Sequence, residues 1–332
     1  MEYLLPRDRE DALRALADRP GAVPVAGGTE VMMRLNAGDE PPAALLDLSR
    51  LAGLAAWSPV GEDTEAAEAV GEGAEAEDGT GAGAAGGRRL DDARAAGRPL
   101  RLGATLTYTR LVRELSGPLP GLAEAAAAVG SRQIRNRGTL GGALGSAWPA
   151  GDLHPMLLAC RADVVLESVR GRRRVPARAL YTGPGSTVRE PDELFTAIEV
   201  PRAAGPQCFT ALGRRSSLTI STASFAVALW PDLGRVGTGM GGVAGTPRAA
   251  TAAEEFVAAE LTRLGAWESA APLPDELLRH FGELAAGESA PVDDVRGSAS
   301  YRRHALAVLA RRTLARAWQQ RHPCRMEREP CA

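Results

Sequence analysis

The first two hundred residues alternate between short apolar runs and helix-like patterns. Residues 7–18 place apolar side chains at helical spacing, between a potential N-cap at Asp8 and a stop at Pro20. A second helix is predicted from near Thr29 to Gly38. Further on, the pattern predicts strands in 22–28, 43–51 and 193–201, a helix in 121–130, a strand followed by a helix in 98–112, and a helix followed by a strand in 153–168.

The second half has a different pattern. Apolar runs in 219–230 and 235–245 predict strands, and 301–318 predict an amphipathic helix with one apolar side. A small sheet packed with helices is therefore expected here. The chain is predicted to have a first domain at 1–203 and a second at 204–320, with the boundary near 202–207. A polar tail at 321–332 follows.

Residues 58–98 break the pattern. Between Glu62 and Asp78 there are eight acidic residues and no basic one, and the remainder is mostly Ala, Gly and Thr. Such a segment buries too little apolar surface to offset the entropy lost on ordering. We predict a disordered acidic insertion, most simply a solvated loop, with an acidic interaction segment as the alternative.

Composition removes several kinds of chemistry. The chain contains no lysine, so its 39 basic residues are all arginine, and Schiff-base or Walker-type lysine sites are excluded. A net charge of −2 argues against a general nucleic-acid binder. The four cysteines form no C-x-x-C pair, so no metal site is predicted. Neither a secretory signal nor a membrane-spanning run is visible, which predicts a cytoplasmic protein.

Two glycine pairs carry the candidate chemistry. "VAGGTE" (25–30) lies between a predicted strand and helix, where backbone amides can bind a phosphate, with Glu30 as a structural cap. Alone, this segment is more simply a tight turn. "TLGG" (139–142) offers a second turn of the same kind, after Arg135 and Arg137, of which at least one is expected to be solvated. Together the two turns suit a pyrophosphate bound mainly by backbone amides.

Three other features were weighed against simpler explanations. "GTGMGG" (237–242) matches a dinucleotide motif only formally, because no helix follows it directly. Asp152 is either an N-cap or a carboxylate that accepts hydrogen bonds from a sugar or ribityl hydroxyl. His154 is predicted to be structural. No catalytic residue is assigned in this chain.

Four segments together resemble a known family. "VAGGTE", "LRLGATLTYTRL", "GSRQIRNRGTLGGALGSAWPAGDLHPMLLACRADV" and "GGVAGTPRAATAAEEF" are similar to the FAD-binding medium subunits of molybdenum hydroxylases, such as xanthine dehydrogenase and carbon monoxide dehydrogenase. The resemblance implies an α+β fold of the vanillyl-alcohol-oxidase/para-cresol-methylhydroxylase type. Two subdomains would hold FAD between them, and a small C-terminal α+β domain would follow.

The resemblance also implies which residues bind FAD. The first loop around the pyrophosphate would be Pro24, Val25, Ala26, Gly27, Gly28, Thr29, Glu30 and Val31. The second would be Thr139, Leu140, Gly141, Gly142 and Ala143, with Asp152 at the family's nucleotide-binding aspartate and Val129 and Phe195 near the cofactor. The chain departs from the family pattern at Ala143, where an Asn is usual. It also lacks a lysine ahead of Arg214 and Arg215, and it carries the 58–98 insertion.

The function implied by the resemblance is an electron-transfer subunit. A partner with a molybdopterin cofactor would oxidise the substrate, and a small subunit with [2Fe–2S] clusters would pass electrons to FAD and on to NAD or another acceptor. Two alternatives remain open: a stand-alone flavin oxidoreductase of the same fold, and a flavin-binding protein whose activity has decayed.

Overall fold

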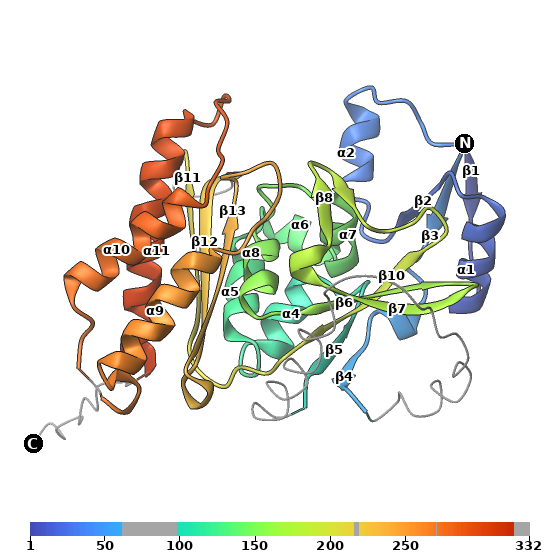
Figure 1. Cartoon of the computed structure of the whole chain (residues 1–332). Helices are drawn as coiled ribbons and strands as arrows, with labels where there is room; N and C mark the ends of the chain where they lie inside the picture. Colours follow the sequence, from blue (N-terminus) through green and yellow to red (C-terminus); the bar gives the residue numbers. More distant parts are fainter. Residues whose placement is uncertain (62–97, 216–218, 270, 322–332) are drawn as a thin grey trace, which may run out of the picture.

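The computed structural model describes residues 1–61, 98–215, 219–269 and 271–321, and places them in three parts side by side (Figure 1). The N-terminal part is a parallel sheet in the order β1-β3-β2, in which α1 connects β1 to β2 and α2 lies between β2 and β3. Asp8 accepts a hydrogen bond from the amide of Asp11, so it caps α1 as predicted. The bounds are β1 (Glu2–Leu4), α1 (Arg9–Asp18), β2 (Ala22–Val25), α2 (Val31–Asn36) and β3 (Ala44–Asp47).

The central part is an antiparallel sheet in the order β4-β5-β10-β6-β7. Helices α4 to α8 complete this part, and the apolar faces of α4, α5, α7 and α8 form one continuous core with the sheet. Helix α6 buries none of its residues. The strands are β4 (Trp57–Pro59), β5 (Leu100–Gly103), β6 (Asp163–Ser168), β7 (Gly171–Pro176) and β10 (Leu194–Val200). The helices are α4 (Tyr108–Leu115), α5 (Pro120–Ala128), α6 (Arg132–Arg137), α7 (Leu140–Ser146) and α8 (Leu153–Ala159), and a hairpin of β8 (Tyr181–Gly183) and β9 (Ser186–Thr187) adjoins them.

The start of the predicted insertion needs a correction. Residues 57–59 form strand β4, which pairs with Leu100 to Leu102 of β5, because Trp57 packs against the central core. The ordered structure therefore extends past residue 58. Residues 62–97 of the insertion lie outside the described residues, as does the predicted tail apart from Arg321.

The C-terminal part is an antiparallel sheet, β11-β12-β13, with helices on both faces. Its own helices cover one face, while α5 and α8 of the central part cover the other (Figure 1). The predicted apolar side of 301–318 is confirmed, since Leu306 and Leu314 are fully buried. The elements are β11 (Gln207–Gly213), β12 (Ser221–Trp230), β13 (Arg235–Gly241), α9 (Thr251–Arg263), α10 (Asp275–Gly287) and α11 (Ala299–Arg321).

Glycines in β13 explain how closely α8 approaches this sheet. A Cβ at Gly237 or Gly239 would overlap the carbonyl oxygens of Ala159 and Pro155 on α8. The "GTGMGG" match is therefore a packing feature of a strand, as its weak context suggested. A partly buried ion pair also joins the two parts: Arg178, after β7, donates to Glu254 of α9. Glu254 also accepts from the amide of Thr238 at 2.5 Å.

The guanidinium group of Arg321 lies between the indole rings of Trp267 and Trp318 and holds the end of α11. The guanidinium carbon of Arg321 lies 5.4 Å from the ring centre of Trp267 and 4.7 Å from that of Trp318. Arg321 also donates to the carbonyl of Ala266 at 3.0 Å. We expect Arg321→Leu to lower the free energy of unfolding by about 1–2 kcal/mol. Thermal unfolding of the apoprotein measures the loss, and Arg303→Leu, exposed on the same helix, should leave the midpoint unchanged.

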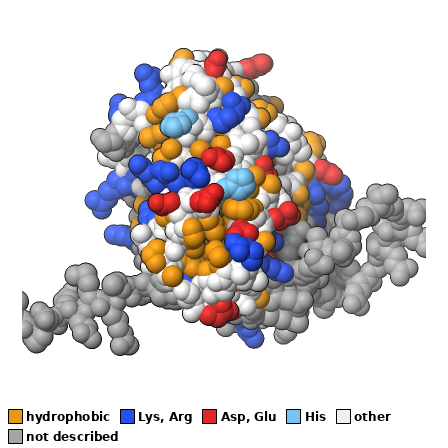
Figure 2. All heavy atoms as spheres, turned by 60° about the vertical axis from the view of Figure 1, so that its left-hand side comes forward, with side chains coloured by type: hydrophobic (Ala, Val, Ile, Leu, Met, Phe, Trp, Pro, Cys, Tyr) orange, Lys and Arg blue, Asp and Glu red, His pale blue; other side chains and the backbone are white. Residues whose placement is uncertain are grey.

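The outer face of this domain carries arginine and acidic side chains interspersed with apolar ones (Figure 2). Among the described residues, no helix is both long and apolar enough to cross a membrane.

Candidate functional site

The two glycine segments meet in space although they lie about 110 residues apart in sequence. Gly27 rests directly on the backbone of Arg137, and a Cβ there would overlap the Arg137 carbonyl oxygen. Arg137 in turn approaches the carbonyl of Gly27 through its Nε, at 3.4 Å. Only a residue without a side chain permits this contact, so the glycine at position 27 is required for the two segments to converge.

The first segment, residues 26–31 between β2 and α2, leaves its amides available. Among the described residues, none of these six amides donates a hydrogen bond to another group. Gly28 adopts a φ of +73°, which aims the chain around the turn. The expectation that Glu30 caps α2 is wrong, because its side chain makes no capping bond. The segment therefore presents a run of unpaired donors next to a free carboxylate.

The second segment is a helix start rather than an open turn. Thr139 caps α7 by accepting from the amide of Gly142 at 3.1 Å. The amides of Leu140 and Gly141 donate to the carbonyls of Leu106 and Ala104, at 3.1 and 2.6 Å. The prediction of a second amide cradle is therefore not supported by the hydrogen bonding. Instead, Gly141 lets the start of α7 approach the residue that follows β5, because a Cβ at Gly141 would lie 2.8 Å from that of Ala104.

A cavity of about 420 Å³ lies between these segments. Most of the residues predicted to bind a cofactor line it: Pro24, Val25, Ala26, Gly27, Gly28, Thr29, Glu30, Val31, Thr139, Gly141, Gly142, Ala143 and Phe195. Three do not. Leu140 is fully buried in the central core, and Val129 packs against that core. Asp152 is not part of the lining, although it lies close enough to Tyr108 for its charge to raise the pKa of that tyrosine.

The sequence analysis missed several residues of the cavity wall. Ala104, Thr105 and Tyr108 come from the "LGATLTYT" segment, which contributed to the resemblance but to none of the site assignments. A glycine and an alanine between a predicted strand and a predicted helix were the sequence signal that could have marked this segment as part of the site. Arg189 and Leu194 line the cavity as well. No local sequence motif marks them, because they are distant in sequence from the glycine segments and reach the cavity only through the fold.

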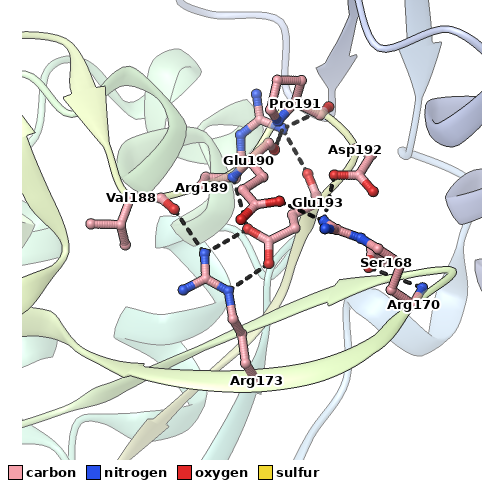
Figure 3. Close-up of polar contacts among 9 residues, drawn as sticks. All are labelled: Ser168, Arg170, Arg173, Val188, Arg189, Glu190, Pro191, Asp192 and Glu193. Atoms are coloured by element: carbon pink, nitrogen blue, oxygen red, sulfur yellow. Dashed lines mark hydrogen bonds and ion pairs between the residues drawn. The ribbon is translucent and has the colours of Figure 1, made fainter. Parts of the chain in front are cut away.

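Arg189 is held by a compact polar cluster (Figure 3). Its Nη1 donates to the carbonyls of Glu190 and Glu193, at 3.0 and 2.6 Å. The Glu193 carboxylate accepts from Arg173 at 2.5 and 2.7 Å. Burial is the largest single influence on the pKa of Glu193 and would raise it, but Arg173, the amide of Glu190 and the charge of Arg170 together lower it. The cluster fixes a cation in the cavity wall on the side of Phe195.

Asp152 joins the central and C-terminal parts. The capping alternative is wrong: the side chain makes no capping bond and instead accepts from the hydroxyl of Ser221 at 2.6 Å. Burial raises the pKa of Asp152 to about 6, and the Ser221 hydrogen bond opposes that rise only in part. A buried carboxylate with one donor can accept more hydrogen bonds.

Two predictions about neighbouring basic residues can also be assessed. His154 is structural as predicted: it is buried, its Nδ1 lies 2.7 Å from the hydroxyl of Tyr181, and burial lowers its pKa to about 4. Arg135 donates to the carbonyls of Val129 and Gly130 at the end of α5, while Arg137 is exposed. One of the two arginines is thus solvated, as expected.

Comparison with known proteins agrees with this architecture. The model of the FAD binding domain in molybdopterin dehydrogenase matches residues 88–203, and that of the CO dehydrogenase flavoprotein C-terminal domain matches 208–317. The carbon monoxide dehydrogenase medium chain of Afipia carboxidovorans is 30% identical over 231 residues, covering 68% of this chain and 76% of that one. This chain belongs to the FAD-binding medium subunits of molybdenum hydroxylases. The predicted α+β fold is confirmed with it.

Other relatives match this medium subunit over nearly its whole length. The nicotine 6-hydroxylase medium subunit of Paenarthrobacter nicotinovorans is 26% identical and covers 96% of this chain and 97% of its own. Among solved structures, reconstituted CO dehydrogenase from Oligotropha carboxidovorans contains a chain that is 26% identical, with a TM-score of 0.76 and coverage of 96% and 98%.

The residues present in this medium subunit fit an FAD. Unpaired backbone amides at 26–31 suit phosphate oxygens, which bind to such donors without any lysine. The cavity volume and its mixed apolar and polar wall are typical of a cofactor site. At position 143, where the family usually has an asparagine, this chain has Ala143, which places a methyl group in the cavity wall.

Proposed function

We propose that this subunit binds FAD in the cavity between residues 24–31 and α7, and passes electrons through it to NAD⁺ or another acceptor. The observation that carries the proposal is the contact of Gly27 with Arg137, which closes one cavity around the free amides of 26–31. Bound flavin supplies the redox chemistry, since it can exchange one or two electrons. The chain supplies position, shielding and charge.

In this proposal, the groups that donate electrons to the flavin lie in other chains. A large subunit with a molybdopterin cofactor would oxidise the substrate, and a small subunit with [2Fe–2S] clusters would deliver the electrons. Relatives named as medium subunits or medium chains support this division of labour. Within the described residues, no group of His, Cys, Asp and Glu is arranged to hold a metal ion, which is compatible with clusters held elsewhere.

Two measurements test the proposal. The purified full chain, freed of flavin, should bind added FAD stoichiometrically with a shift of the flavin absorption and quenched fluorescence. The complex purified with its partner subunits should then reduce NAD⁺ when its substrate is added. A chain that binds no FAD would overturn the site. A complex that reduces artificial dyes or oxygen but not NAD⁺ would exclude NAD⁺ and leave another acceptor as the physiological one.

A further inference from the structure

Tyr108 lies where the parts of the cavity wall meet. It is the first residue of α4, and its amide donates to the carbonyl of Gly138 at 3.1 Å. The edge of its ring packs on Gly138, where a Cβ would lie 2.8 Å from the Tyr108 Cε2. Gly138 directly follows Arg137, on which Gly27 rests. Backbone contacts therefore fix the ring beside the convergence of the two glycine segments.

The hydroxyl of Tyr108 has no partner within the described part of the chain. The residue is only 8% exposed, yet no hydrogen bond connects its Oη to another described residue. The oxygen is nevertheless not among the fully sealed polar atoms that lack a partner. It therefore keeps accessible surface, and the space that the side chain borders is the cavity. A tyrosine buried to this degree normally finds a hydrogen-bond partner.

The surroundings make this hydroxyl a donor. Burial raises the pKa of Tyr108, and the negative charges of Asp152 and Glu30 raise it further. The phenol is therefore protonated at neutral pH. A ligand that satisfies it must present an acceptor.

We propose that Tyr108 donates a hydrogen bond through Oη to an oxygen of the FAD held in this cavity, and so fixes the position of the cofactor. The inference rests on the proposed function, because FAD is the ligand that it names. The oxygens that FAD offers are those of its phosphates, its ribityl chain and its ring carbonyls. Tyr108 is then a positioning residue at a place in the wall that the glycine motifs do not include.

The test removes one oxygen atom. Tyr108→Phe in the full chain should weaken FAD binding about tenfold, measured by fluorescence titration of the apoprotein. Tyr301→Phe, a half-exposed tyrosine on α11 of the C-terminal part, is the matched control and should bind FAD as the wild type does. Because the removed hydroxyl has no partner among the residues that the structure describes, thermal unfolding of the Tyr108→Phe apoprotein should occur at or above the wild-type midpoint.

Shorter ligands locate the acceptor. If ADP and FAD lose affinity equally, the hydroxyl meets a phosphate oxygen of the ADP half; if only FAD and FMN lose affinity, it meets the flavin half. Either result supports the inference. Equal FAD affinity of Tyr108→Phe and wild type would overturn it, as would a lowered unfolding midpoint of the apoprotein that accounts for the lost binding. A wild-type chain that binds no FAD would instead overturn the proposed function, and this inference with it.

Discussion

Gly27→Ala is expected to abolish FAD retention. A Cβ at residue 27 would overlap the carbonyl oxygen of Arg137 and lie 2.5 Å from its carbon and 3.2 Å from the amide nitrogen of Gly138. All three atoms belong to backbone, so no side-chain rotation relieves the clash, and the two segments must separate. Overpacking of this kind costs about 3 kcal/mol or more, which corresponds to at least about a hundredfold loss of affinity. The flavin content of the purified chain and an FAD titration measure it.

The control for this substitution lies just before β2, outside the segment 26–31. At Gly21 nothing lies within 4 Å of a Cβ, so Gly21→Ala adds the same methyl group without a clash and should retain FAD. The C-terminal domain has its own apolar core, and its far-UV circular dichroism signal should persist in both variants. A Gly27→Ala chain that binds FAD normally would mean that the segments do not meet as the structure places them.

The sequence predicts those parts of the fold that depend on local pattern. Apolar spacing identified α11 and its buried Leu306 and Leu314, because a helix that packs on a sheet must repeat apolar residues every three or four positions. The alternation of strand and helix around Gly27 and Gly28 was equally local. These features are encoded within a dozen residues and need no partner segment.

What the sequence could not predict depends on contacts between distant segments. The pattern of Thr139 to Gly142 is compatible with a turn or with a helix start, and the carbonyls of Ala104 and Leu106 decide for the helix. The interaction of Asp152 with Ser221 spans two domains, so the capping explanation was the natural local alternative. Tyr108 escaped notice because an aromatic residue at the start of a helix is usually part of the core; its free hydroxyl is visible only in three dimensions.

Asp152→Asn is expected to stabilise the apoprotein at pH 7 while weakening its hold on FAD. The folded-state pKa of Asp152 is about 6, against 3.8 for an unperturbed aspartate, and burial is the main cause. Between these two values the folded chain retains a proton that the unfolded chain releases, so stability falls as pH rises through this window. The deficit at pH 7 is about 2–3 kcal/mol, and an asparagine, which carries no charge, avoids it.

Urea unfolding of the apoproteins at pH 4 and pH 7 separates this effect from a change in packing. The gain of Asp152→Asn over wild type should be present at pH 7 and nearly absent at pH 4, where the aspartate is protonated in the folded state. Ser221→Ala removes the hydroxyl that opposes the shift, so it should raise the pKa of Asp152 further and lower stability at pH 7. Asp232→Asn, at an exposed position, serves as the control for loss of a surface charge.

Asp152 does not line the cavity of the empty chain, so the role that the family resemblance implies requires bound FAD to reach this carboxylate. In that role the same substitution should weaken FAD binding by about 1–3 kcal/mol, because hydrogen bonds from cofactor hydroxyls to a buried carboxylate are stronger than those to an amide. A residue that lowers the stability of the protein without cofactor is retained where its contacts with the bound cofactor offset that loss. Asp152 is such a residue if the stability gain and the affinity loss occur together in one variant. An asparagine variant that is less stable than wild type at pH 7, and that binds FAD equally well, would assign to this carboxylate only the structural bond with Ser221.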